Sequence, residues 1–132
     1  MKKISLNIFN ETDSFRTPVS KMKKVFDVFL RRYKRLLKTY DVSVIFVKKN
    51  KMKALNELWK GGSGATDVLS FDYGEIYICP EVADKYRKDY STTLTEEVLF
   101  LFVHGLLHIS GFTHEDDKKF AIMMKKTEEI LK

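Results

Sequence analysis

The sequence predicts a single domain, residues 1–132, that combines β-strands with α-helices. A chain of this length is ordinary for one domain and long enough to bury a core. Residues 4–10 alternate apolar and polar side chains, which is the pattern of a half-buried strand. The run over residues 94–110 is apolar on nearly every side, which favours a central buried helix. No repeat, linker or low-complexity tract divides the chain.

The first part of the chain predicts two strands separated by a long helix. Residues 43–47 give the second strand pattern. Between the strands, apolar residues recur at three- and four-residue steps and fall on one line of a helix. These residues are Met22, Phe26, Phe29, Tyr33, Leu36 and Tyr40, and the opposite line carries Lys24, Arg31, Arg35 and Lys38. A basic stripe opposite a buried face is typical of a solvated helix, which we prefer to a role in RNA contact.

The middle of the chain predicts short elements. A helix over residues 51–60 ends at a glycine-rich loop, residues 61–64, which lacks the residue order of a phosphate-binding P-loop. Residues 65–80 hold two strand-like runs around a turn near Gly74. The proline that ends the second run suits the opening of a helix over residues 81–89.

Two capping signatures predict the last two helices. Thr93 and Glu96 form a capping box in front of the apolar run. Thr113 and Asp116 form a weaker pair, which would place His114 in the first turn of a helix that reaches the end of the chain.

The composition indicates which cellular compartment and which classes of binding partner to expect. The net charge of +6 favours polyanionic partners, although solubility alone would explain it equally well. The lone Cys79 cannot form an internal disulfide, which is compatible with a reducing compartment. No segment approaches the roughly 18 apolar residues that a membrane span requires. We therefore expect a cytoplasmic protein with no membrane partner.

All three histidines of the chain lie in one short segment, HGLLHISGFTH. His104 and His108 are four residues apart, so on a helix they share one face about 6 Å apart along the axis. Gly111 can end that helix and let the chain reverse, so that His114 supplies a third nitrogen. Three imidazoles around Zn²⁺ leave a fourth position open, which is typical of a catalytic site.

This segment differs from the zinc-protease signature HExxHxxGxxH at Gly105, where the protease has its catalytic glutamate. A glycine inside a helix costs about 1 kcal/mol relative to alanine, which indicates that substrate or a neighbouring backbone needs the space. Glu97 shares the helical face of His104 but lies roughly 10 Å away along the axis, too far to bind the same ion. We expect Glu97 to be a solvated glutamate of the first turn.

Two separate segments resemble the YbeY family of rRNA maturation endoribonucleases. HGLLHISGFTH is similar to the family signature HGxLHLxGYDH. Residues 55–71, LNELWKGGSGATDVLSF, resemble the family's LNxxYR, a short polar loop and TDVLSF, and GEIYIC follows as the family's next strand. Two motifs in the right order make a chance match improbable.

The resemblance implies an α+β fold: a single domain with a small mixed four-stranded β-sheet, about five helices, and a central buried helix carrying two metal-ligand histidines. It implies one Zn²⁺ ion held by His104, His108 and His114. It also implies a metal-dependent single-strand endoribonuclease that acts in rRNA processing, in 16S rRNA 3′-end maturation and in ribosome quality control. The expected partners are RNA of the small ribosomal subunit and ribosome-associated proteins.

Two positions depart from the family pattern. Lys60 stands where the family has an arginine, so it keeps the charge that could contact substrate and assist catalysis but loses the bidentate fork that fits a phosphate. Thr113 replaces an aspartate. Thr66, Asp67 and Ser70 are candidates to line the substrate cleft, although turn and strand-end hydrogen bonding would explain them equally well.

Two other functions stay open at this point. A zinc-dependent peptidase would use the same histidines without the usual glutamate. A non-enzymatic, RNA-binding ribosome assembly factor would use the zinc only for structure. The hypothesis we prefer has the zinc ion acting as a Lewis acid on a scissile phosphate, with either water or the RNA 2′-hydroxyl as the nucleophile.

Overall fold

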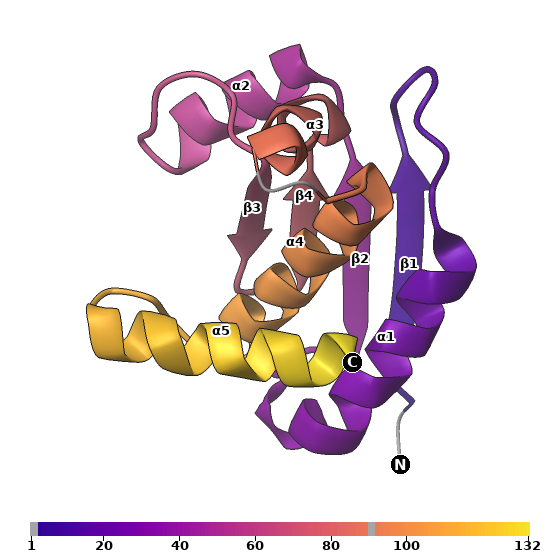
Figure 1. The fold of residues 1–132 in the computed structure, drawn as a ribbon, viewed down its shortest axis with the longest axis vertical. Coiled ribbons are helices and arrows are strands. Elements are labelled where there is room, and N and C mark those ends of the chain that lie inside the picture. The colour runs from indigo at the N-terminus through magenta and orange to yellow at the C-terminus, as the bar shows by residue number, and fades with distance from the viewer. Residues whose placement is uncertain (1–2, 90–91) are drawn as a thin grey trace.

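The chain folds around one mixed four-stranded sheet with the strand order β1-β2-β4-β3, as the computed structural model shows (Figure 1). The structure describes residues 3–89 and 92–132. β1, β2 and β4 run parallel, and β3 pairs antiparallel with β4. The strands are β1 (Ser5–Asn10), β2 (Asp41–Phe46), β3 (Val68–Phe71) and β4 (Glu75–Ile78).

The described residues also form five α-helices. They are α1 (Val19–Tyr33), α2 (Lys49–Trp59), α3 (Pro80–Asp89), α4 (Leu94–Ile109) and α5 (Asp117–Leu131). The predicted α+β class, with its small mixed sheet and central buried helix, is confirmed. Within the described residues, no helix has both the length and the apolar character needed to span a membrane.

Helices cover both faces of the sheet because side chains alternate between the faces along each strand. On one face, Val44 and Ile76 join the main core with buried side chains of α1, α4 and α5. On the other face, Ile45 and Leu69 pack with Met52 of α2. α4 contacts α1, α3, α5, β3 and β4, so it is the element on which the rest of the fold converges.

α1 is shorter than its apolar pattern predicts. It ends at Tyr33, and a 3₁₀ turn over Lys34–Leu36 leads to an extended Leu37. The prediction that Leu36 and Tyr40 continue the buried line is wrong, because these side chains are 42% and 55% exposed. The chain must leave the helix here to enter β2 beside β1, and the carbonyl of Tyr40 already accepts a hydrogen bond from the backbone of Ser5.

The beginning of α4 follows the predicted capping box. The Thr93 hydroxyl accepts from the backbone N–H of Glu96 at 3.1 Å, and the Glu96 carboxylate accepts from the backbone N–H of Thr93 at 3.0 Å. These two bonds satisfy amides that have no partner inside the helix. The hydrogen bond from the Thr93 backbone N–H to the Glu96 carboxylate also holds the pKa of Glu96 below its usual range.

The beginning of α5 differs from its prediction. Asp116, not Thr113, caps the helix: its backbone is extended and its carboxylate accepts from the backbone N–H of Lys119 at 2.7 Å. His114 therefore lies in the loop between α4 and α5 and not in the first turn of α5. A stronger cap nearer the apolar positions of α5 overrides the weaker one.

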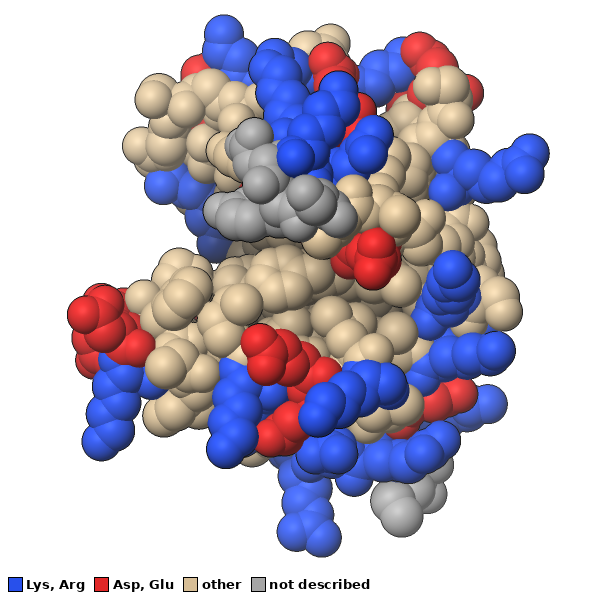
Figure 2. Space-filling model, viewed as in Figure 1, with Lys and Arg blue, Asp and Glu red and all other residues tan. Residues whose placement is uncertain are grey.

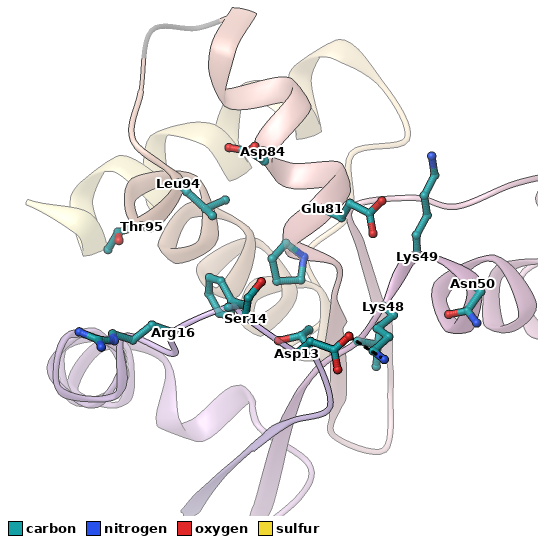
Figure 3. Close-up of a pocket in the computed structure, with 14 residues that line it drawn as sticks. Asp13, Ser14, Arg16, Lys48, Lys49, Asn50, Glu81, Asp84, Leu94 and Thr95 are labelled. Atoms are coloured by element: carbon teal, nitrogen blue, oxygen red, sulfur yellow. Dashed lines mark ion pairs between the residues drawn. The ribbon is translucent and has the colours of Figure 1, made fainter.

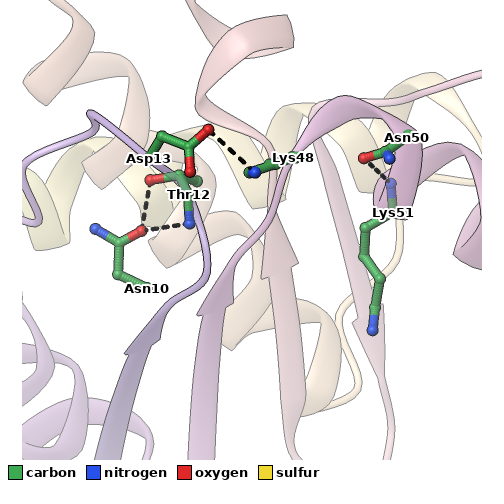
Figure 4. A network of polar contacts seen from close by, with 6 residues as sticks. All are labelled: Asn10, Thr12, Asp13, Lys48, Asn50 and Lys51. Atoms are coloured by element: carbon green, nitrogen blue, oxygen red, sulfur yellow. Dashed lines mark hydrogen bonds and ion pairs between the residues drawn. The ribbon is translucent and has the colours of Figure 1, made fainter.

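A pocket of about 790 Å³ lies at the carboxyl ends of the parallel strands (Figure 3). Its lining includes Asp13 after β1, Lys48 after β2 and Pro80 after β4. The Lys48 ammonium pairs with the Asp13 carboxylate at 3.0 Å, beside a turn in which Asn10 accepts from Thr12 (Figure 4). No histidine lines this pocket, so it is separate from the histidine cluster.

Candidate metal centre

The three histidines converge at the end of α4. His104 and His108 project from adjacent turns of the helix, with their Nε2 atoms 3.1 Å apart. Gly111 has a φ of 103°, a left-handed conformation that reverses the chain at little cost for glycine. The reversal brings His114 back, so that one ligand atom from each ring lies within 4.8 Å of the others.

The donor set fits a transition-metal ion. A tetrahedral zinc ion with Zn–N bonds of 2.0–2.1 Å separates its ligand nitrogens by about 3.3 Å, close to the spacing of His104 and His108. His104 and His108 are half-buried and His114 is exposed, so the cluster is open to solvent on one side.

Protonation also favours metal binding. Burial first, and then the neighbouring His108 and His114 rings, together lower the pKa of His104 to about 4. The pKa of His108 is lowered mainly by burial as well. Both imidazoles are therefore neutral at neutral pH, which leaves nitrogen lone pairs available to an ion.

Aromatic packing orients the rings. Phe100 stacks on His104 with ring centroids 6.0 Å apart, and Phe120 of α5 meets His114 edge to face at 6.3 Å. The His108 ring hydrogen-bonds to the backbone of Phe112. Nδ1 of His104 is buried and has no hydrogen-bond partner among the described residues, so packing holds that ring in place.

Gly105 gives α4 its close approach to the sheet. A Cβ atom at this position would lie 2.7 Å from Cγ2 of Ile76 on β4, which is fully buried. The space that the sequence indicates at Gly105 is therefore filled by a core side chain, and not by substrate or backbone. A glutamate in the protease position has no room in this fold.

Lys60 lies on the His108 side of the cluster. It follows α2, is exposed, and places its ammonium 4.7 Å from the ring centroid of Phe71. Its positive charge contributes to the lowered pKa of His108. Among the residues that sequence analysis proposes for substrate contact, Lys60 is thus the cation that approaches the histidines.

The glycine-rich loop after Lys60 is anchored to α2. The Asn56 side chain donates to the carbonyl of Gly64 at 3.0 Å, and the backbone N–H of Gly64 donates to Glu57 at 3.2 Å. A Cβ atom at Gly62 would collide with the Asn56 side chain. The loop is therefore packed against its own helix, in agreement with the absence of a P-loop motif.

Asp67 lies on the His104 side of the cluster. It is half-buried and lines a pocket of about 550 Å³ together with His104. The Thr66 hydroxyl donates to the Asp67 carboxylate at 3.3 Å, and the backbone carbonyl of Asp67 accepts from the backbone N–H of Cys79 at 2.9 Å. Thr66 thus supports Asp67, and Ser70 follows on β3 on the strand face that carries Val68 toward α4.

Of the residues that line this pocket, only Asp67 and His104 are among the site residues that the sequence predicts. The expectation of a solvated Glu97 is wrong: it is half-buried, and burial first, then the Asp67 charge, raise its pKa. Its place seven residues before His104 on the same helical face was the available signal. Tyr86, Phe100 and Phe120 come from three different helices, so no local pattern could bring them together.

Comparison with known proteins agrees with this geometry. A family model described as endoribonuclease YbeY matches residues 7–132. An endoribonuclease YbeY of Thermotoga neapolitana is 37% identical over 102 residues, which cover 74% of this chain and 68% of the relative. An endoribonuclease YbeY of Thermodesulfovibrio yellowstonii is 31% identical over 150 aligned positions, which cover 96% of this chain and 94% of the relative.

A solved structure shares the fold. The solution structure of a Thermotoga maritima protein superimposes with a TM-score of 0.66 at 28% sequence identity, covering 96% of this chain and 87% of that one. The family match includes the whole histidine segment and the motif around Lys60. This chain belongs to the YbeY family of endoribonucleases.

Proposed function

We propose that this protein is a metal-dependent endoribonuclease that cleaves single-stranded RNA in rRNA processing. The observation that carries the proposal is the cluster of three histidines, open to solvent, in a chain of this family. The proposed cellular role is 16S rRNA 3′-end maturation and ribosome quality control in the cytoplasm, on the small ribosomal subunit and with ribosome-associated proteins.

The proposed ligands of one Zn²⁺ ion are His104, His108 and His114. When bound, the ion would supply Lewis acidity to a phosphoryl oxygen of the RNA. Neutral imidazoles suit zinc among several transition metals, and family membership is the reason to prefer it. The rings of His104 and His108 need no proton release to bind an ion, because burial already keeps both neutral.

Lys60 and the Asp67 segment would hold the substrate. The Lys60 ammonium would offset the negative charge that builds on the phosphoryl oxygens during cleavage. Thr66 and Ser70 would position the strand that carries Asp67 at the entrance. A lysine gives one point charge where an arginine gives a bidentate fork, so we expect this phosphate contact to be weaker than that of an arginine.

The peptidase alternative has no observation in its favour. The peptidase signature needs a glutamate at position 105, and Ile76 fills that space. A purely structural zinc is also disfavoured, because a structural site is closed by four protein ligands and the described residues bring three histidines together.

The decisive experiment combines metal analysis with cleavage of a labelled single-stranded RNA. We expect the purified protein to bind one zinc ion, to gain thermal stability from it, and to cleave the RNA. His108→Ala should lose the ion, the stabilisation and the cleavage. A protein that binds no transition metal would defeat the metal proposal, and cleavage of casein without cleavage of RNA would favour the peptidase.

Substitution of Lys60 separates its role from general charge. Lys60→Met should lower kcat/KM by about tenfold or more, and Lys60→Arg should retain or raise activity. Lys53→Met is the matched control, because Lys53 is an exposed lysine of α2, the helix that Lys60 follows. Equal losses in Lys60→Met and Lys53→Met would show that only net charge matters.

A further inference from the structure

The pocket beside His104 is built by three helices and the segment that enters β3. It has a volume of about 550 Å³, within the range of small-molecule sites. In Figure 2 the surface is hollowed above α5, where most of the visible side chains are uncharged. The lining residues are Asp67, Tyr86, Glu97, Phe100, Leu101, His104, Phe120 and Met124.

Two aromatic side chains of this pocket are about half exposed to solvent. Tyr86 of α3 is 47% exposed and Phe120 of α5 is 49% exposed. Both line the same pocket, on either side of α4, and Phe120 also touches the ring of His114. Exposed aromatic rings around a cleft are the stacking platforms of proteins that bind single-stranded nucleic acid.

The charges of the pocket are all acidic. Asp67 and Glu97 are its carboxylates, and the described residues that line it include no lysine or arginine. Such a pocket repels a phosphate but accepts hydrogen bonds from amino groups. The pKa of each carboxyl is raised mainly by burial, so both groups face a partly desolvated space.

Lys60 does not line this pocket, and its positive charge acts on the His108 ring of the same cluster. An RNA strand carries charged phosphates next to bases that are neutral, flat and edged with amino groups. The site therefore offers a cation to an RNA phosphate and an aromatic, acidic pocket to a base.

We infer that the pocket binds one unpaired nucleobase of the RNA substrate, stacked against Phe120 and Tyr86, with its amino group donating to Glu97 or Asp67. This inference rests on the proposed function, since it places the base next to a phosphate held at the histidines. It predicts a preference for bases with an exocyclic amino group. Cytosine and uracil test this preference most directly, because they differ at the position where cytosine carries an amino donor and uracil a carbonyl.

The test measures the binding of metal-loaded protein to cytidine and uridine nonamers by fluorescence anisotropy. Their riboses carry 2′-O-methyl groups that block attack by the 2′-hydroxyl, and gel analysis after the measurement checks that water has not cleaved them. We expect the wild type to bind the cytidine nonamer about tenfold more tightly, which corresponds to one hydrogen bond to a charged acceptor. Glu97→Gln should reduce this preference to about twofold or less, because an amide can pair with either base.

Substitutions of the aromatic rings test the stacking. Phe120→Ala should weaken the binding of both nonamers by about tenfold without changing the preference, because stacking tolerates any base. Tyr86→Ala should act in the same direction. Ile122→Ala is the matched control, since Ile122 is a 44% exposed apolar residue of the same helix outside the pocket.

The outcomes separate this inference from the proposed function, because binding is read without cleavage. If the wild type cleaves RNA but shows no base preference, and the Glu97, Phe120 and Tyr86 variants bind as it does, the base pocket is refuted and the endoribonuclease stands. If the variants behave as expected and the protein cleaves no RNA, the pocket stands and the endoribonuclease fails. Equal zinc content in all variants, and melting temperatures no lower than that of the wild type, must accompany either result.

Discussion

Gly105 shows how one residue sets the distance between the helix that carries the histidines and the sheet. The Gly105→Ala substitution should lower the free energy of unfolding by about 1–2 kcal/mol, because overpacking against Ile76 outweighs the better helix propensity of alanine. Urea denaturation measures this change.

A double-mutant cycle isolates the contact. Ile76→Ala alone leaves a cavity, but Gly105→Ala added to it should cost nothing or stabilise the protein, because the new methyl group then has space. Additive effects of the two substitutions would mean that the Gly105 backbone, and not the contact with Ile76, determines the result.

Glu97 gives a pH-dependent signature at the scale of one residue. Burial raises the pKa of this carboxyl, so between its unfolded and folded pKa values the folded protein binds more protons than the unfolded chain. Stability therefore falls as pH rises through that window. Glu97→Gln should melt at a higher temperature than the wild type at pH 7, and the gain should shrink as pH falls through the raised pKa. A difference in melting temperature that stays constant with pH would contradict this account.

At the scale of elements, the cap of α4 tests what holds the central helix. Thr93→Ala removes the hydroxyl that accepts from the backbone of Glu96 and should cost about 1 kcal/mol in the free energy of unfolding. Thr95→Ala is the matched control, because Thr95 lies in the first turn and does not cap the helix. Equal losses would assign the effect to helix propensity.

The elements also show what the sequence could and could not predict. α4 was predictable from its cap to Gly111, because a capping box, an apolar run and a left-handed glycine all act locally. The end of α1 was not, because it depends on pairing between β2 and β1, which lie far apart in the chain. The prediction of where α5 begins was wrong because two candidate capping residues lie within four residues of each other.

Some residues of the candidate site were likewise predictable from the sequence and others were not. The histidine cluster was predictable because its three residues lie on one helix and the turn that follows. The approach of Lys60 followed from the resemblance of its motif, and no spacing rule would have placed it near His108. The aromatic part of the pocket depends on the packing of α3, α4 and α5, which only the folded molecule shows.

At the scale of the whole molecule, charge governs encounter with RNA. The chain has 24 basic and 18 acidic residues, and basic side chains line the lower edge of the view in Figure 2. We expect the logarithm of RNA affinity to fall linearly with the logarithm of salt concentration, with a slope of about −0.7 for each phosphate neutralised on a single strand. Lys60→Gln should make the slope shallower by about that amount, whereas Phe120→Ala should leave it unchanged. Affinity that does not change with salt would mean that the positive charge has no part in binding.

Because His114 lies in a loop, the local stability of the C-terminal region would depend on a bound metal ion. His104 and His108 are fixed by a buried, capped helix, but His114 is exposed and is tied to α5 through the ring of Phe120. An ion held by all three residues would join the α4–α5 loop to the core by a coordinate bond. Amide hydrogen exchange in residues 111–120 would then slow when the ion binds and quicken when a chelator removes it, while exchange in the middle of α4 stays nearly constant. The local stability of the C-terminal region would thus become a readout of metal availability.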